Sequence, residues 1–169
     1  LEGNEIEIYV DRAPEVWSWQ SELVEMTIDP LNFSALAEQQ TATGWQGMPL
    51  GTIMGHLHLY VSELTKTKDF YTKGLGFEIV SRYANQALFL STGHYHHHIA
   101  INTWMGVGAP KAQANQLGMA FATIQYPDQE ALAQVKQQLT QLGVTLTEKD
   151  GIIFTSDPSG NQLHLTTNK

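Results

Sequence analysis

The segment GHLHLYVSEL, residues 55–64, decides the fold, because the rest of the chain can be placed from it. Polar and apolar side chains alternate over 56–61, a pattern typical of a half-buried strand. Ser62 can cap a helix over 63–73, and a glycine at 74 or 76 can end that helix. The segment therefore predicts a strand that leads directly into a helix.

The same order of elements is expected twice. Three further strands follow the first helix, over 77–83, 87–91 and 96–103. After a glycine-containing linker over 104–117, a second unit is expected, with a strand over 120–126, a helix over 129–142 and strands over 144–148, 152–155 and 162–167. The spacings agree: Gly76 to Gly143 is 67 residues, His56 to Phe121 is 65, and His98 to His164 is 66. Even spacing of this kind indicates an internal repeat.

The predicted fold class is α+β, with two tandem βαβββ modules that form one cupped mixed sheet. The modules span 53–104 and 118–169, and a connector with a short helix over 31–40 spans 11–52. The segment EIEIYV, residues 5–10, alternates like a strand. We interpret 1–10 as the last strand of a missing N-terminal domain; the alternative is an edge strand that belongs to this domain.

Composition narrows the classes of partner. The chain of 169 residues has a net charge of −8, and residues 1–52 carry nine acids and one base while the remainder is balanced. A nucleic acid requires a basic face, so none is expected as a partner. No apolar run approaches the roughly 20 residues of a membrane span, and Cys is absent. We expect no membrane partner and a cytoplasmic location.

Seven histidines are the main candidates for chemistry. Four of them lie in HYHHH, residues 94–98, and two lie in the first segment. Because alternate strand residues face opposite sides, His56 and His58 are predicted to face away from the helix, and so are His96, His98 and His164. His97 is predicted to face the helix. Such convergence favours a metal site, since imidazole binds Fe, Zn, Cu and Ni. The alternative is a hydrogen-bonded polar pocket without metal.

Several segments carry a resemblance to a known family. They are GHLHLYVSEL at 55–64, DFY at 69–71, GLGF at 74–77 and DPSGN at 157–161. In these segments the chain resembles members of the glyoxalase/bleomycin-resistance/extradiol-dioxygenase (vicinal oxygen chelate) superfamily. The stretch 95–104 is similar to bacillus-type catechol 2,3-dioxygenases of four modules, and the opening GNEIEIY, residues 3–9, resembles the close of their second module. As a whole the chain resembles the C-terminal half of such an enzyme.

The resemblance implies metal ligands on the first and fourth strands of each module. Carried over, these positions are His56, His98, Phe121 and His164. Extradiol enzymes have a second His at the Phe121 position and a Glu at the His164 position, so this chain departs from the family pattern twice. A three-His set of His56, His98 and His164 remains, which resembles hydrolytic zinc sites as much as oxygenase sites. No Asp or Glu is expected to face the cavity, and Glu7 occupies a family ligand position that belongs to the absent module pair.

The resemblance therefore implies the C-terminal part of a metal-dependent, ring-cleaving dioxygenase. It would use Fe(II), with Mn or Zn as alternatives, and a small catecholic substrate, with His58 and His96 as candidate acid–base residues. Whether the chain is an enzyme by itself is left open. The alternative is a binding or scaffolding domain without metal. An unpaired strand edge also predicts a homodimer.

Overall fold

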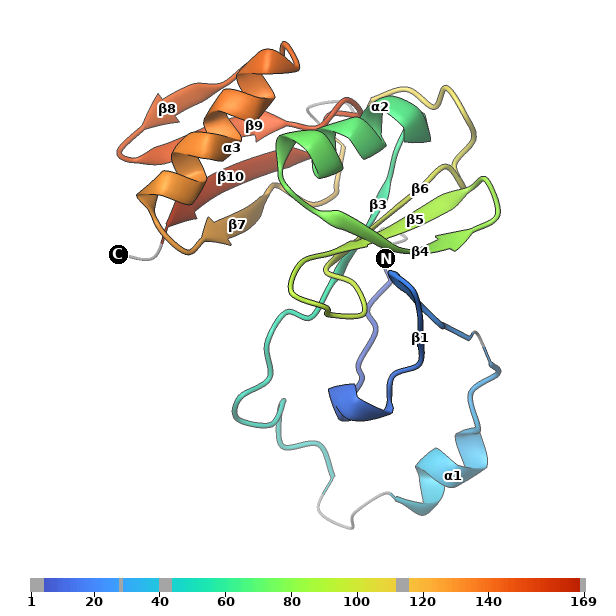
Figure 1. Cartoon of the computed structure of the whole chain (residues 1–169). Helices are drawn as coiled ribbons and strands as arrows, with labels where there is room; N and C mark the ends of the chain where they lie inside the picture. The colour runs from blue at the N-terminus through green and yellow to red at the C-terminus, as the bar shows by residue number, and fades with distance from the viewer. Residues whose placement is uncertain (1–4, 28, 40–43, 112–115, 168–169) are drawn as a thin grey trace.

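The computed structural model describes residues 5–27, 29–39, 44–111 and 116–167. It contains two four-stranded sheets, each covered by a helix, and an N-terminal region that extends below them in Figure 1. The repeat of strand, helix and three strands is confirmed in both halves of the chain.

The first module forms one sheet in the order β3-β6-β5-β4. Strands β3 and β6 run parallel, and the other neighbours are antiparallel. Its elements are β3 (Leu57–Tyr60), α2 (Leu64–Asp69), η2 (Phe70–Gly74), β4 (Glu78–Tyr83), β5 (Ala87–Ser91) and β6 (Ile99–Asn102).

The second module repeats this arrangement in the order β7-β10-β9-β8, with β7 and β10 parallel. Its elements are β7 (Ala122–Tyr126), α3 (Gln129–Gln141), β8 (Thr147–Lys149), β9 (Ile152–Ser156) and β10 (Gln162–Thr167). The expectation of one continuous sheet is wrong, because β3 and β7 are edge strands of separate sheets among the described residues. Side chains join the modules instead: the Asn161 Nδ2 donates to the Tyr60 carbonyl at 3.3 Å, and Ser62 N donates to the Ser159 Oγ at 2.8 Å.

Local sequence accounts for the helix ends. Glu63, and not Ser62, caps α2, because its carboxylate accepts from the backbone N–H groups of Thr65 and Lys66 at 2.8 Å each. Asp128 caps α3 in the same way. The predicted helix over 63–73 is divided, since after Asp69 it widens into one π-helical turn, η2.

One core joins the helices of both modules. The π turn packs against α3, and a Cβ on Gly74 would lie 2.7 Å from the Leu139 side chain. Glycine at this position therefore allows the close approach. The largest fully buried apolar side chains come from both modules: Tyr71, Leu75, Leu90, Ile101, Leu139, Leu163 and Leu165.

The N-terminal region is mostly extended. It contains η1 (Pro14–Val16), a hairpin of β1 (Trp19–Gln20) and β2 (Leu23–Val24), and α1 (Phe33–Glu38). The predicted strand over 5–10 pairs with no other strand among the described residues. Residues 1–4 of the predicted N-terminal segment and residue 40 of the predicted connector helix lie outside the described residues. We call residues 5–11 the arm.

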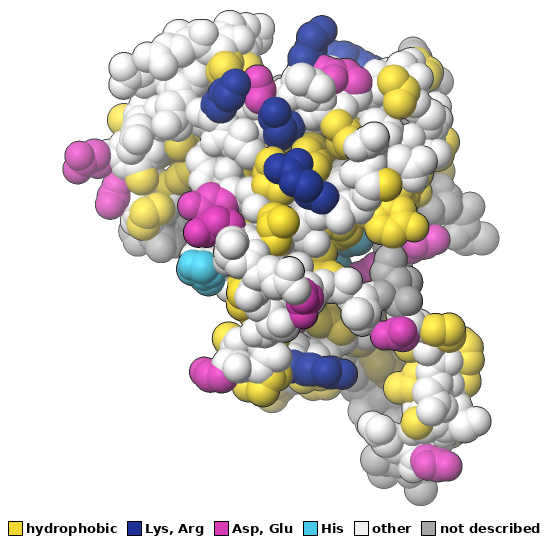
Figure 2. Space-filling view, turned by 45° about the vertical axis from the view of Figure 1, so that its right-hand side comes forward, with side chains coloured by type: hydrophobic (Ala, Val, Ile, Leu, Met, Phe, Trp, Pro, Cys, Tyr) yellow, Lys and Arg dark blue, Asp and Glu magenta, His cyan; other side chains and the backbone are white. Residues whose placement is uncertain are grey.

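Hydrophobic side chains lie open on the surface of this region. In Figure 2 they are visible on its lower part, below the two modules. The exposed fraction is 87% for Ile6 and 93% for Val10 in the arm, and 74% for both Phe33 and Trp45 in the connector. None of the helices in the described residues is long and apolar enough to cross a membrane.

Candidate metal centre

The histidine-rich stretch lies mostly in a loop. Strand β6 begins only at Ile99, and the preceding residues bend, with His94 at a φ of 57°. Strand alternation therefore applies only from Ile99 onward. His97 turns toward the open face of the sheet, where its ring centroid lies 5.4 Å from that of His58 and 5.1 Å from that of Phe89. The prediction that His97 faces the helix is wrong for this reason.

Three histidines come together at the start of β3. His56, His58 and His97 each offer a ring nitrogen, and these atoms all lie within 4.8 Å of one another. The Nε2 atoms of His58 and His97 are 3.3 Å apart. His97 is buried, whereas His58 is exposed at the rim. The group is therefore open on one side.

Burial disfavours the charged form of two of these imidazoles. It lowers the pKa of His97 to about 3, with a further contribution from the neighbouring histidines. Burial also lowers the pKa of His58. A neutral imidazole keeps a lone pair on one nitrogen, which is the form that binds a metal ion.

The arm adds a carboxylate to the group. The Glu7 Oε2 lies 2.8 Å from the His56 Nε2, although Glu7 was assigned to an absent module pair and no carboxylate was expected at the cavity. The Tyr9 hydroxyl lies 3.0 Å from the other nitrogen of His56, Nδ1. A Cβ on Gly55 would lie 1.9 Å from that hydroxyl, so only glycine allows the arm to approach this closely.

A second carboxylate of the N-terminal arm, that of Asp11, contacts Tyr95 and His96. The Tyr95 hydroxyl donates to the Asp11 Oδ2 at 2.9 Å, and the Asp11 Oδ1 lies 2.9 Å from the His96 Nε2. Burial raises the pKa of Tyr95, and its hydrogen bonds to Tyr9 and Asp11 raise that pKa further. The Tyr95 hydroxyl therefore keeps its proton.

The other predicted ligands lie elsewhere. The His98 Nδ1 lies 3.0 Å from the Ser91 Oγ, and its ring faces Phe77. The His164 ring stacks on Phe121 at 3.9 Å. Neither belongs to the three-histidine group.

The strand register explains the difference. His164 pairs with Phe154 and Thr123, whereas in the first module the corresponding strands pair Ala100 with Phe89 and His58. His164 therefore corresponds to Ala100, and the loop before β6 is two residues longer than the loop before β10. The sequence spacing of 66 residues paired His164 with His98, whereas the register pairs His164 with Ala100 at a spacing of 64.

Sequence reasoning also missed three polar residues of the site, Tyr9, Asp11 and Tyr95. Alternation in the arm puts Glu7, Tyr9 and Asp11 on one face, so a signal for two of them was present. No pattern indicated that this face would contact the histidines.

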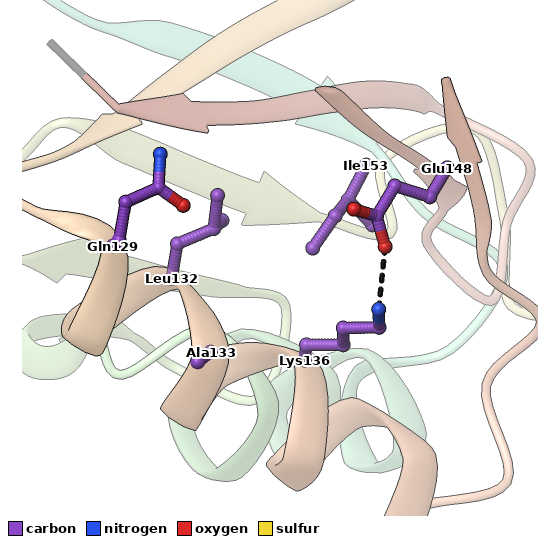
Figure 3. A pocket seen from close by; sticks show the side chains of 6 residues that line it. All are labelled: Gln129, Leu132, Ala133, Lys136, Glu148 and Ile153. Carbon is purple, nitrogen blue, oxygen red and sulfur yellow. Dashed lines mark hydrogen bonds and ion pairs between the residues drawn. The ribbon is translucent and has the colours of Figure 1, made fainter. Parts of the chain in front are cut away.

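A separate small cavity of about 130 Å³ lies between α3 and the strands β8 and β9. Figure 3 shows its lining, in which Lys136 of α3 and Glu148 of β8 form an ion pair beside Ile153. Its charged groups are thus paired with each other. It contains no histidine, so the imidazole group is the stronger candidate site.

The chain is similar to a known protein family and to a curated relative. The family model described as Glyoxalase/Bleomycin resistance protein/Dioxygenase superfamily matches residues 53–165. A catechol-2,3-dioxygenase of Bacillus subtilis (strain 168) is 38% identical over 159 residues, which is 93% of this chain. The chain spans only 56% of the length of that relative.

Solved structures support the fold alone. Glyoxalase I of Leishmania major is similar with a TM-score of 0.55 and 19% identity, covering 69% of this chain and 86% of that one. A lactoylglutathione lyase from Agrobacterium tumefaciens is similar with a TM-score of 0.51 and 18% identity, covering 72% and 96%.

Proposed function

Because the chain belongs to the glyoxalase/bleomycin-resistance/dioxygenase superfamily, we propose that it is the C-terminal part of a metal-dependent dioxygenase that cleaves a catechol-type ring beside its hydroxyl groups. The identity to a catechol-2,3-dioxygenase supports the substrate class. The observation that carries the proposal is the group of His56, His58 and His97 with Glu7 beside it.

The donor set fits a divalent transition metal. Imidazole and carboxylate ligands together are typical of non-haem Fe(II) sites, and Mn or Zn are alternatives. His56, His58 and His97 would hold the ion, and Glu7 would supply the carboxylate. When bound, the metal would act as a Lewis acid and as a template for the diol and O₂.

The protein residues would orient the ring and move its protons. Phe89 lies beside His58 and His97, with ring centroids 6.2 and 5.1 Å away, and offers an apolar surface for an aromatic substrate. His96 is the candidate base for a diol proton, because Asp11 orients its ring through Nε2. His58 is exposed at the rim and is the second candidate.

The roles of His98 and His164 as ligands stay predictions. Single substitutions to Gln at positions 56, 97, 98 and 164, each followed by elemental analysis, assign the ligands directly. We expect metal content to fall only for the first two. Metal lost only in the His98 or His164 variants would restore the set that the sequence predicted.

The activity is tested on the intact protein with Fe(II) and catechol. We expect oxygen uptake together with a yellow ring-opened product that contains both atoms of O₂. Glu7→Gln should remove both bound metal and product, whereas Glu15→Gln, a matched change on η1, should remove neither. Iron-loaded intact protein that forms no product would reject the proposal.

A second candidate function is a binding domain without metal. The stacked Phe121 and His164 favour it, because they fill a family ligand position with an aromatic pair. Metal-free protein that still binds catechol with unchanged affinity would support this role and exclude the first.

We also propose that the protein forms a homodimer in the cytoplasm. The arm has an unpaired backbone among the described residues and an exposed apolar row of Ile6, Ile8 and Val10. Analytical ultracentrifugation tests this, and a monomer at all concentrations would contradict it.

A further inference from the structure

A groove with a volume of about 710 Å³ lies on the first module, beside its helix. One wall is formed by α2 and η2, the second by β4 with Phe77 before it, and the third by the turn of the β1–β2 hairpin. Ligand sites in proteins commonly have volumes of about 300–1,000 Å³. None of the residues that line the groove belongs to the three-histidine group, so the groove is a separate candidate site.

The hairpin completes the groove from a distant part of the sequence. Its strand β2 packs against the edge strand β4, and Figure 1 shows the hairpin below β4. Val24 of β2 is buried. The turn consists of Ser21, which has a φ of 56°, and Glu22, which lines the groove. The buried Val24 therefore anchors a turn that brings Glu22 to the first module.

A β-bulge puts Arg82 on the groove side of β4. The register of β4 against β5 shifts between Ile79 and Ser81. Before the shift, Ile79 pairs with Leu90. After it, Arg82 pairs with Leu88. Directly paired residues share one face of a sheet, and both leucines belong to the core cluster. Without the extra residue, strand alternation would have put Arg82 on the opposite face from Ile79.

Arg82 is the free cation of the groove. The Lys73 Nζ lies 2.9 Å from the Asp69 Oδ2, and the Lys68 Nζ lies 3.6 Å from the Asp69 Oδ1, so the two lysines share one carboxylate. The Arg82 guanidinium makes no hydrogen bond or ion pair with the residues that the structure describes. A guanidinium binds a carboxylate through two parallel hydrogen bonds. The groove therefore offers this group to a carboxylate ligand.

Two carboxylates of the groove are also unpaired. Glu22 on the hairpin turn and Glu78 on β4 form no ion pair or side-chain hydrogen bond within the described part of the chain. Phe77 and Ile79 add apolar surface to the lining. The lining contains three bases and three acids, so a purely anionic ligand would meet as much repulsion as attraction. A complementary ligand carries a negative group, a positive group and an apolar body.

We propose that this groove binds a small zwitterion with an apolar body, of which an amino acid with an apolar side chain is the simplest form. Its carboxylate pairs with the Arg82 guanidinium. Its ammonium group donates to Glu22 and Glu78, and its side chain lies on Phe77 and Ile79. The inference does not depend on the proposed dioxygenase function, because no residue of the groove is a candidate metal ligand.

Isothermal titration of the whole chain tests the class of ligand. The protein is first passed over a chelating resin, because amino acids also bind metal ions. The probes are L-phenylalanine, 3-phenylpropionate, which lacks the ammonium group, and 2-phenylethylamine, which lacks the carboxylate. We expect L-phenylalanine to bind at least about 10-fold more tightly than either analogue, since each analogue loses hydrogen bonds between charged groups. No binding of L-phenylalanine, or equal binding of either analogue, would overturn the inference.

Substitution of Arg82 tests the carboxylate end of the ligand. Arg82→Gln should weaken the binding of L-phenylalanine about 10-fold and leave that of 2-phenylethylamine unchanged, because this probe has no carboxylate. Arg12→Gln, at the other arginine of the chain, is the matched control. Circular dichroism checks that both variants are folded. Equal losses in the two variants, or weaker binding of 2-phenylethylamine in Arg82→Gln, would contradict the assignment.

A double variant tests the ammonium end. Glu22→Gln with Glu78→Gln should weaken the binding of L-phenylalanine about 10-fold, whereas 3-phenylpropionate should bind no more weakly than before. Glu15→Gln with Glu130→Gln removes two acids outside the groove and is the matched control. If 3-phenylpropionate loses as much affinity as L-phenylalanine, the acids have no role in recognising the positive group and the zwitterion is the wrong class.

Amide NMR signals locate the bound ligand. L-Phenylalanine should shift the signals of residues 68–73 and 77–82 and those of the hairpin turn. Hydrogen exchange within the hairpin should become slower, because the ligand joins Glu22 to β4. The signals of Phe121 and His164 in the second module should stay unchanged. Shifts confined to the second module or to the three-histidine group would reject the groove as the site.

Discussion

The first module carries imidazoles where the second carries aromatic rings. At the start of the first strand His56 stands in one module and Phe121 in the other. His56 contacts Glu7, Tyr9 and the other histidines, whereas Phe121 stacks on His164. The same backbone thus supports a polar site in one half and a stacked aromatic pair in the other.

This difference shows how one topology can serve two purposes. A βαβββ sheet supplies a face on which alternate residues meet, but the residues on it are free to vary. In the first module, a loop longer by two residues brings in His97, and the arm adds Glu7. The second module has the shorter loop. The following predictions test this contrast.

The largest effect should come from the core that the modules share. Leu139 on α3 is fully buried and approaches Gly74 of the first module. Leu139→Ala should lower the free energy of unfolding by about 3 kcal/mol, in one cooperative transition measured in urea by fluorescence and by circular dichroism. Leu50→Ala, at a fully exposed side chain, should change little. Two separate transitions would mean that the modules are independent.

The contrast in chemistry should appear in metal affinity. His97→Gln should weaken Co(II) binding more than about 100-fold, a loss of about 2.7 kcal/mol, because it removes a buried member of the group. His164→Gln should leave the affinity within a factor of about two. Isothermal titration of both variants measures this. Equal losses would mean that the two modules share one site.

The fold could be predicted from the sequence because it depends on periodicity. The alternation in GHLHLYV, the helix start at Asp128 and the stop at Gly143 are local signals, although Glu63 caps the first helix in place of the predicted Ser62. The observed boundaries of the elements differ from the predicted ones by only a few residues. For example, the helix predicted over 63–73 corresponds to α2 and η2, which together span 64–74. The separation into two sheets could not be predicted, since it depends on contacts between side chains far apart in sequence.

The site was only partly predictable. His56 lies beside a regular strand and His58 lies in it, so the alternation of side chains along the strand predicted which face of the sheet they occupy. His97 lies in a loop, where strand alternation does not apply. Asp11 contacts His96, which is 85 residues away in the sequence. Such contacts depend on how the arm folds back, and local sequence does not determine this.

A third prediction concerns Asp157, which links the two modules through a hydrogen bond from Tyr71. This buried carboxylate accepts from the backbone of Ser159 and Asn161 and from the Tyr71 hydroxyl at 3.3 Å. Asp157→Ala should lower the free energy of unfolding by about 2 kcal/mol, and Tyr71→Phe by about 1 kcal/mol. Urea unfolding measures both, with Tyr83→Phe as the control.

The effect of Asp157 should depend on pH. Burial raises its pKa above the ordinary value, although its hydrogen bonds oppose the shift. A raised pKa in the folded protein means that stabilisation is greatest at acid pH and is lost as the pH rises through that pKa. The difference in unfolding free energy between the unmodified protein and Asp157→Ala should therefore be larger at about pH 4 than at about pH 8. A difference that grows with pH would show that the hydrogen bonds dominate.

The smallest effect should come from the aromatic pair of the second module. Phe121 stacks on His164 with an interplanar angle of 20°, and Phe154 meets the same imidazole edge-on at 4.6 Å. Because Phe121 is half exposed, Phe121→Ala should lower the unfolding free energy by only about 1 kcal/mol. It should leave Co(II) affinity unchanged, because the three-histidine group lies in the other module. Phe121→His restores imidazole to the family ligand position and is the sharper variant. If it creates a second Co(II) site with His164, a single side chain separates the two modules in metal binding. If it does not, the proposed metal site of the first module also requires the longer loop and the arm.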